Sequence, residues 1–117
     1  MDFISQFFKQ SSINQLEPTQ VHSLVDQSPK PFLLDVRTPD EFKQGHVLGA
    51  VLIPLDELSV KLVRIPKDRQ IICICATGSR SSNAARQLNS MGYKVNNMHG
   101  GMSHWIHAGL PVQKGSK

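Results

Sequence analysis

The sequence predicts an α/β fold with a central, mainly parallel sheet of four or five strands and helices on both faces. Three observations favour this fold. Short apolar runs typical of buried strands alternate with segments of helical periodicity. The connections between these runs are long enough for crossovers between parallel strands. The 117 residues suffice for one hydrophobic core but not for two, so we expect one domain.

The first part of the chain is expected to contain helices on either side of its first strand. A short helix at residues 2–9 would place four apolar side chains on one face: Phe3, Ile4, Phe7 and Phe8. A second helix opens at Pro18 and ends near Ser28, and PFLLDV at residues 31–36 predicts a buried strand. Thr38 can then cap a third helix, with Glu41 placed for a capping box.

The rest of the chain repeats the alternation of strand and helix. We expect a strand at 51–53, a helical segment at 56–63, the central strand at 70–75, a helix at 79–90 closed by Gly92, a strand at 95–98 and a helix at 101–107. Residues 1–10 would form an N-terminal extension and residues 11–112 the domain. Residues 113–117 would form a polar, frayed tail.

The composition limits the partners of the protein. The formal charge is +4, from 13 basic and 9 acidic residues, but the basic residues are scattered and form no tract for nucleic acid. A mild positive field favours small anionic substrates. No apolar run approaches the roughly 20 residues of a transmembrane segment. The N-terminus lacks the features of a secretory signal, so we expect a cytoplasmic location.

The loop after the predicted central strand carries the chemistry. Cys75 ends the strand, Gly78 permits a tight turn, and a helix follows. Inward-facing amides and the positive end of that helix would bind an anion, with Ser79 or Ser81 as the helix cap and Arg80 as a nearby positive charge. Such surroundings lower the pKa of a cysteine from about 8.5. We therefore expect Cys75 to be a thiolate.

A thiolate at this position predicts covalent chemistry. It can attack the outer sulfur of thiosulfate, displace sulfite and become a persulfide, which is itself an anion. A nucleophile such as cyanide or a cellular thiol then removes the sulfur. Two such half-reactions predict ping-pong kinetics.

The sequence also resembles the rhodanese domains. The resemblance rests on three ordered groups of residues: Asp35-Val36-Arg37 to Glu41-Phe42, Gly45-His46, Gly49-Ala50 and Pro54; Cys75-x-x-Gly78-x-Arg80-Ser81; and Gly92-Tyr93, Gly100-Gly101-Met102-x-x-Trp105 and Gly109-Leu110-Pro111. It covers residues 16–112. It implies the rhodanese fold, a persulfide intermediate, and no metal or organic cofactor.

The length of the loop that resembles the rhodanese active site distinguishes sulfur transfer from phosphatase chemistry. Four residues lie between Cys75 and Arg80. The related dual-specificity cell-cycle phosphatases have five, which widens the loop for a phosphate. The shorter loop favours transfer of a single sulfur. The substrate-binding loop would comprise Ala76, Thr77, Gly78, Ser79, Arg80 and Ser81.

Other residues near this loop have competing interpretations. Cys73 lies inside an apolar strand, which favours a core role over that of a resolving thiol for Cys75. Arg80 is expected to recognise the anionic substrate, with a salt bridge at the helix start as the alternative. Asp35 and Arg37 follow a neighbouring strand, and the resemblance assigns them a structural role that supports the site.

The histidines and the one tryptophan receive structural interpretations. His46 is expected to pack within the domain, and Trp105 to anchor the core. His104 and His107 stand three apart on a predicted helix near His99, a spacing that some metal sites use. No acidic or cysteine partner is close in sequence. We therefore expect surface or capping roles and no metal site.

Three functions remain open on the sequence. The leading one is an enzyme that moves sulfane sulfur from a small anionic donor, thiosulfate or another persulfide, to cyanide, a thiol or a protein acceptor. The second is a sulfur carrier with weak thiosulfate turnover. The third is a noncatalytic interaction module, against which Cys75 and Arg80 both argue.

Overall fold

The computed structural model describes residues 13–117. The expected N-terminal helix at residues 2–9 lies outside this range, so its prediction is not tested. Among the described residues, no helix has both the length and the apolar character needed to cross a membrane.

The centre of the fold is a five-stranded, wholly parallel sheet in the order β1-β5-β4-β2-β3. Its strands are β1 (Gln15–Leu16), β2 (Phe32–Asp35), β3 (Val51–Leu52), β4 (Gln70–Ile74) and β5 (Lys94–Met98). The predicted central strand is confirmed, because β4 has two strands on each side, but it ends at Ile74 and leaves Cys75 just beyond it. β1 was not predicted from the sequence. Its two residues pair only with the end of β5.

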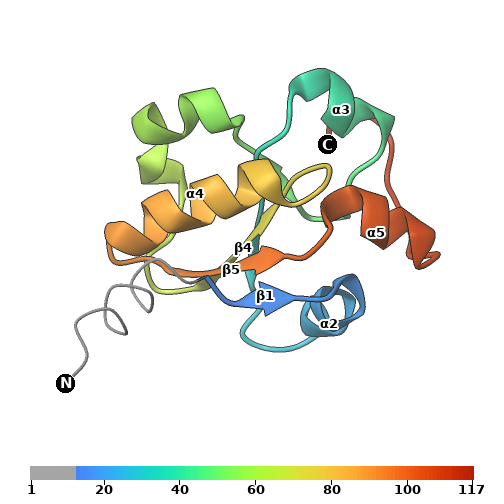
Figure 1. The fold of residues 1–117 in the computed structure, drawn as a ribbon, viewed down its shortest axis with the longest axis horizontal. Coiled ribbons are helices and arrows are strands. Elements are labelled where there is room, and N and C mark those ends of the chain that lie inside the picture. Colours follow the sequence, from blue (N-terminus) through green and yellow to red (C-terminus); the bar gives the residue numbers. More distant parts are fainter. Residues whose placement is uncertain (1–12) are drawn as a thin grey trace.

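Helices cover both faces of the sheet, as the fold class requires (Figure 1). They are α2 (Pro18–Leu24), α3 (Pro39–Gln44), α4 (Ser79–Ser90) and α5 (Gly101–His107), with the 3-10 helices η1 (Leu55–Val60) and η2 (Leu62–Arg64). The segment expected to be helical at 56–63 is therefore two short 3-10 helices. α4 and η1 lie against one face of the sheet, and α2 and α5 lie against the other.

The side-chain alternation of β4 divides the core into two layers. Ile71 and Cys73 face the layer that contains Ala84 and Leu88 of α4. Ile72 and Ile74 face the layer that α2 and α5 complete, together with Met98 and Trp105. All of these side chains are buried. Because both faces of β4 are covered, its sequence is apolar throughout rather than alternating.

The ends of the helices follow several of the predicted signals. Thr38 caps α3, with the reciprocal hydrogen bonds to Glu41 that define a capping box. α4 spans the predicted residues, and Gly92 follows its end with φ of 91°.

Two predictions about chain ends and caps were wrong. Neither Ser79 nor Ser81 caps α4: its N-cap is Gly78, whose left-handed backbone makes the turn, and no side chain takes the cap. The C-terminal tail is not frayed in the structure. Gln113 exchanges backbone hydrogen bonds with His46, and the Gly115 amide donates to the Lys43 carbonyl, so the tail is held against the end of α3.

Candidate active site

Cys75 lies directly after β4, at the carboxyl edge of the sheet. This edge is where ligands bind in open parallel α/β sheets. The chain turns back toward α4 within three residues, and Gly78 permits the turn with φ of 106°. A residue with a side chain rarely adopts this backbone angle. The turn brings the first residues of α4 next to the cysteine sulfur.

Two hydrogen bonds converge on the sulfur of Cys75. The Gly78 amide donates to Sγ over 3.1 Å, and the Ser81 hydroxyl donates to it over 3.2 Å. Burial alone would raise the pKa of Cys75, but the Ser81 hydroxyl and the amides of Ser81, Gly78 and Thr77 favour the thiolate and outweigh it. The net effect is a pKa below the ordinary value of a thiol, as the sequence predicted.

The sulfur of Cys75 is enclosed despite its polar partners. Cys75 has an exposed fraction of 0%, whereas Thr77 and Ser79 on the same loop are exposed. A cavity of about 390 Å³ opens on the side of Arg80, lined also by Val36, Pro54 and Leu55, and Cys75 is not part of its wall. A donor therefore reaches the sulfur only when the residues that cover it move. Sequence reasoning did not foresee this closure.

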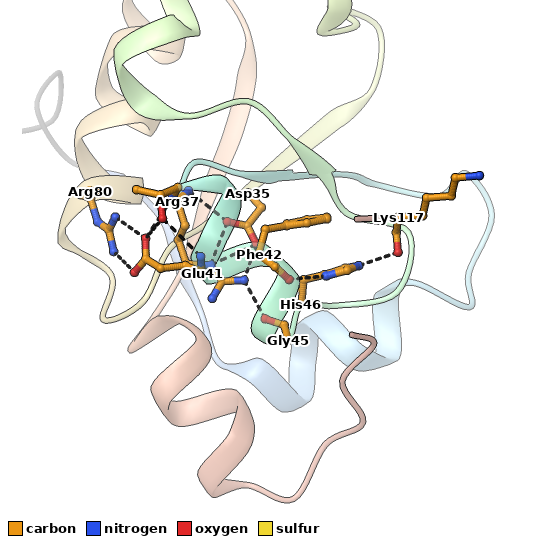
Figure 2. A network of polar contacts seen from close by, with 9 residues as sticks. Asp35, Arg37, Glu41, Phe42, Gly45, His46, Arg80 and Lys117 are labelled. Carbon is orange, nitrogen blue, oxygen red and sulfur yellow. Dashed lines mark hydrogen bonds and ion pairs between the residues drawn. The ribbon is translucent and has the colours of Figure 1, made fainter. Parts of the chain in front are cut away.

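Arg80 forms a two-pronged ion pair with Glu41. Its Nη1 and Nη2 atoms donate to Oε1 and Oε2 of Glu41, each over 2.8 Å, as Figure 2 shows. The hydrogen bond from Arg80 is the main reason that the pKa of Glu41 falls to about 2. The salt bridge that the sequence offered as an alternative role for Arg80 is therefore present. Sequence reasoning gave Glu41 a capping role only, and in the structure it fills both roles.

Asp35 and Arg37, to which the resemblance assigns a supporting role, form a buried ion pair at the end of β2 (Figure 2). Asp35 ends β2, and its carboxylate accepts hydrogen bonds from the Arg37 amide and from Nε and Nη2 of its guanidinium. Nη2 also donates to the Gly45 carbonyl over 2.8 Å. Both side chains are nearly inaccessible. They fasten the end of β2 to the end of α3.

The start of α5 packs under the Cys75 loop. The Met102 amide donates to the Cys75 carbonyl over 2.8 Å, and the Ser103 amide donates to the Ala76 carbonyl over 2.9 Å. A Cβ atom on Gly101 would lie 2.3 Å from the Cys75 carbonyl oxygen, so only glycine fits. Gly101 thus permits the close approach that holds the loop.

Asn97 is a buried polar residue beneath the loop that sequence reasoning missed. Its Nδ2 donates to Oε1 of Gln15 over 2.9 Å and reaches the Gly78 carbonyl at 3.4 Å. Its Oδ1 has no hydrogen-bond partner among the described residues. The available signal was an asparagine within a run of residues that otherwise reads as a buried strand, because a buried amide needs a specific hydrogen-bond partner.

Cys73 has the core role that the sequence favoured. It is fully buried in the layer under α4. Burial, with a smaller contribution from nearby Cys75, raises its pKa to about 12. A thiol in this environment is a poor nucleophile, which counts against a resolving role.

The predicted packing roles of His46 and Trp105 are confirmed. His46 is buried, stacks on the Phe42 ring at 3.6 Å between centroids, and contacts the carbonyls of Phe42 and Lys117 (Figure 2). Trp105 is buried, and its Nε1 donates to the Pro111 carbonyl.

The family of the chain is decided by one comparison. Residues 17–108 match the rhodanese-like domain family. The chain belongs to that family. The resemblance found in the sequence and the predicted fold class are both confirmed, since the rhodanese-like match spans most of the described residues.

Several curated relatives are named sulfurtransferases, and one of Bacillus subtilis is named a putative sulfur carrier protein. A sulfurtransferase of Allochromatium vinosum is 32% identical over 101 residues, covering 86% of this chain and 94% of its own length. The thiosulfate sulfurtransferase GlpE of Tolumonas auensis is 35% identical over 82 residues, covering 69% of this chain and 77% of its own. A rhodanese-related crystal structure from Thermoplasma volcanium superposes with a TM-score of 0.80 at 29% identity, covering 86% and 97%. This chain is thus a rhodanese-like sulfurtransferase family member.

Proposed function

We propose that this chain transfers sulfane sulfur through a persulfide on Cys75, with thiosulfate or a second persulfide as the donor. The observation that carries the proposal is the pair of donors aimed at Sγ, from the Gly78 amide and the Ser81 hydroxyl. Both favour a negatively charged sulfur. The name of the Tolumonas auensis relative supports thiosulfate as the donor.

The first half-reaction loads the sulfur. The Cys75 thiolate attacks the outer sulfur of thiosulfate, the new S–S bond forms, and the bond to the sulfonate sulfur breaks. Sulfite leaves with the electron pair of that bond. The outer sulfur of the product carries the negative charge, and the amides of the Cys75 loop can stabilise it as they stabilise the thiolate.

The second half-reaction returns the enzyme to its starting state. An acceptor such as cyanide or a thiolate attacks the outer sulfur, and Cys75 leaves as a thiolate. Its lowered pKa makes it a better leaving group. No metal or redox cofactor enters the balance of either step.

Arg80 would contribute to donor binding in competition with Glu41. Its guanidinium is already paired at 2.8 Å, so an incoming anion must share it with a carboxylate. The positive charge beside the loop is thus largely neutralised before the donor arrives. We propose that the amides of residues 76–81 contribute more than Arg80 to binding the anionic group.

A sulfur carrier is the second candidate, and the enclosure of Cys75 favours it. A partner protein that docks and opens the loop would reach the sulfur, whereas a small donor must await spontaneous opening. In this case the protein persulfide forms readily from a partner while turnover with thiosulfate stays slow. A noncatalytic module is disfavoured, because it would have no use for the donors on Sγ.

Intact-mass measurement after thiosulfate treatment tests the proposal. We expect a gain of one sulfur atom that cyanide removes, and no gain in the Cys75→Ser variant. A thiosulfate:cyanide assay then separates the two candidates, since slow turnover with a stable, cyanide-sensitive persulfide indicates the carrier. If no persulfide forms with thiosulfate or with a low-molecular-weight persulfide, the proposal fails.

A further inference from the structure

Three metal-ligating side chains gather at the ends of β1 and β5, outside the Cys75 site. Each of Glu17, His99 and His104 offers one ligand atom within 4.8 Å of the other two. Nδ1 of His99 lies 3.0 Å from Oε2 of Glu17. The ring centroids of His99 and His104 are 5.3 Å apart, with the rings nearly perpendicular.

The parallel sheet itself brings Glu17 and His99 together. Leu16 of β1 pairs with Met98 of β5, so the next residue of each strand leaves the sheet at the same edge. The His99 amide donates to the Leu16 carbonyl over 2.8 Å and extends the ladder by one bond. Backbone pairing thus places these two residues side by side at the edge of the sheet. The two residues are 82 positions apart in the sequence, which hid this acidic partner from sequence reasoning.

A glycine makes room for the third ligand. The His104 ring lies against the backbone of Gly100, where a Cβ atom would stand 1.9 Å from Nδ1 and 2.1 Å from Cγ. Gly100 also takes a left-handed backbone, with φ of 74°. Residue 100 therefore has two reasons to be glycine, and the space it leaves is filled by a ring that points back toward His99. His107, three residues further along α5, is not part of this group.

We propose that Glu17, His99 and His104 bind a borderline divalent cation of the Zn²⁺ type. Two imidazoles with one carboxylate form a ligand set that suits Zn²⁺ and not Mg²⁺ or Ca²⁺, which prefer oxygen ligands. Ligand atoms about 3.3 Å apart satisfy tetrahedral Zn²⁺ with bonds of about 2.0–2.1 Å. The His99–Glu17 pair is already near that separation. Because all three side chains are exposed, small rotations can complete it and solvent can take the fourth position.

Direct titration with Zn²⁺ tests the site. The protein is untagged and carries Cys75→Ser, so that the reactive sulfur cannot bind the metal, and a chromophoric zinc chelator competes for the ion. We expect one equivalent to bind, and His99→Ala, His104→Ala or Glu17→Gln to weaken binding at least about tenfold. His107→Ala is the matched control on the same helix and should bind as the parent does. Absence of one-equivalent binding in the parent, or equal weakening by His107→Ala, overturns the proposal.

A second measurement does not depend on the variants folding. Imidazole resonances of the same parent protein are followed by NMR during the Zn²⁺ titration. We expect the signals of His99 and His104 to shift together and saturate at one equivalent, while those of His46 and His107 stay in place. A shift confined to other histidines would show that the ion binds elsewhere and would refute the assignment. If His99 and Glu17 form only an ion pair, no ring signal saturates at one equivalent, which also refutes it.

Discussion

Ser81→Ala is the sharpest test of how the loop activates Cys75. The Ser81 hydroxyl donates to Sγ over 3.2 Å, and it contributes most among the interactions that lower the pKa of the thiol. Alanine removes that donor and leaves the helix intact, because no side chain caps α4. The pKa of Cys75 must then rise.

The size of the effect follows from the hydrogen bond that is lost. A hydrogen bond to a charged group contributes about 1.5–3 kcal/mol, and a long bond to sulfur belongs at the low end. About 1.4 kcal/mol corresponds to a tenfold change in an ionisation constant. At a pH below the titration midpoint, the thiolate fraction of Ser81→Ala should therefore be about tenfold lower than that of the wild type.

The assay is the pH dependence of iodoacetamide alkylation. Midpoints are compared rather than absolute rates, at iodoacetamide concentrations low enough that reaction of the thiolate limits the rate in both proteins. Ser82→Ala is the matched control: its hydroxyl lies one residue away and donates to the Gly78 carbonyl rather than to Sγ. An unchanged midpoint in Ser81→Ala, an equal rise in Ser82→Ala, or a wild-type midpoint above about 8 would refute the reasoning.

Three further predictions concern the frame around the sulfur. Folding lowers the pKa of Glu41 from 4.5 to about 2, so the stabilisation from its charged form is complete above pH 4.5 and is lost as the pH falls toward 2. In urea unfolding, Glu41→Gln should therefore lower the unfolding free energy by about 0.5–1 kcal/mol at pH 7, because the pair with Arg80 is about one-third exposed, and this deficit should vanish toward pH 2. A deficit that stays constant with pH contradicts this. Native alkylation at pH 8 should label Cys75 and spare Cys73 until the chain unfolds, as peptide mapping would show; native labelling of Cys73 would disprove its burial. Gly101→Ala should lower the unfolding free energy by about 3–5 kcal/mol, because its Cβ would clash with the Cys75 carbonyl. Gly109→Ala is the control: it has a similar φ but open space around it, so it should cost only about 1–2 kcal/mol. Equal costs for the two variants would exclude the clash.

Local signals explain what the sequence could predict. The Thr38 cap with Glu41 and the apolar run of β4 act over a few residues, so they can be read without the fold. The motif around Cys75 likewise combines a strand end, a glycine turn and a helix start. Each of these is set by adjacent residues, and each is where it was expected.

Features that depend on distant residues escaped prediction. β1 has two residues and no periodicity, and it exists only because β5 offers it a partner. The Arg80–Glu41 pair joins residues 39 apart, and the choice between that pair and a free guanidinium requires the packing of α3 against the loop. Ser79 or Ser81 was expected to cap α4, but the N-cap is the left-handed Gly78, and the Ser81 hydroxyl donates to the sulfur of Cys75 instead.

The enclosure of Cys75 separates how readily its sulfur ionises from how readily it reacts. The donors on Sγ keep the atom charged, while a 0% exposed fraction withholds it from the solvent. Peroxide and other bulk oxidants meet a closed surface in this conformation, so we expect the irreversible sulfinic and sulfonic states to form slowly. At high reagent concentration the rate of modification should stop rising and equal the frequency with which the loop opens. Protection of the thiolate and its reactivity thus reside in the same short turn.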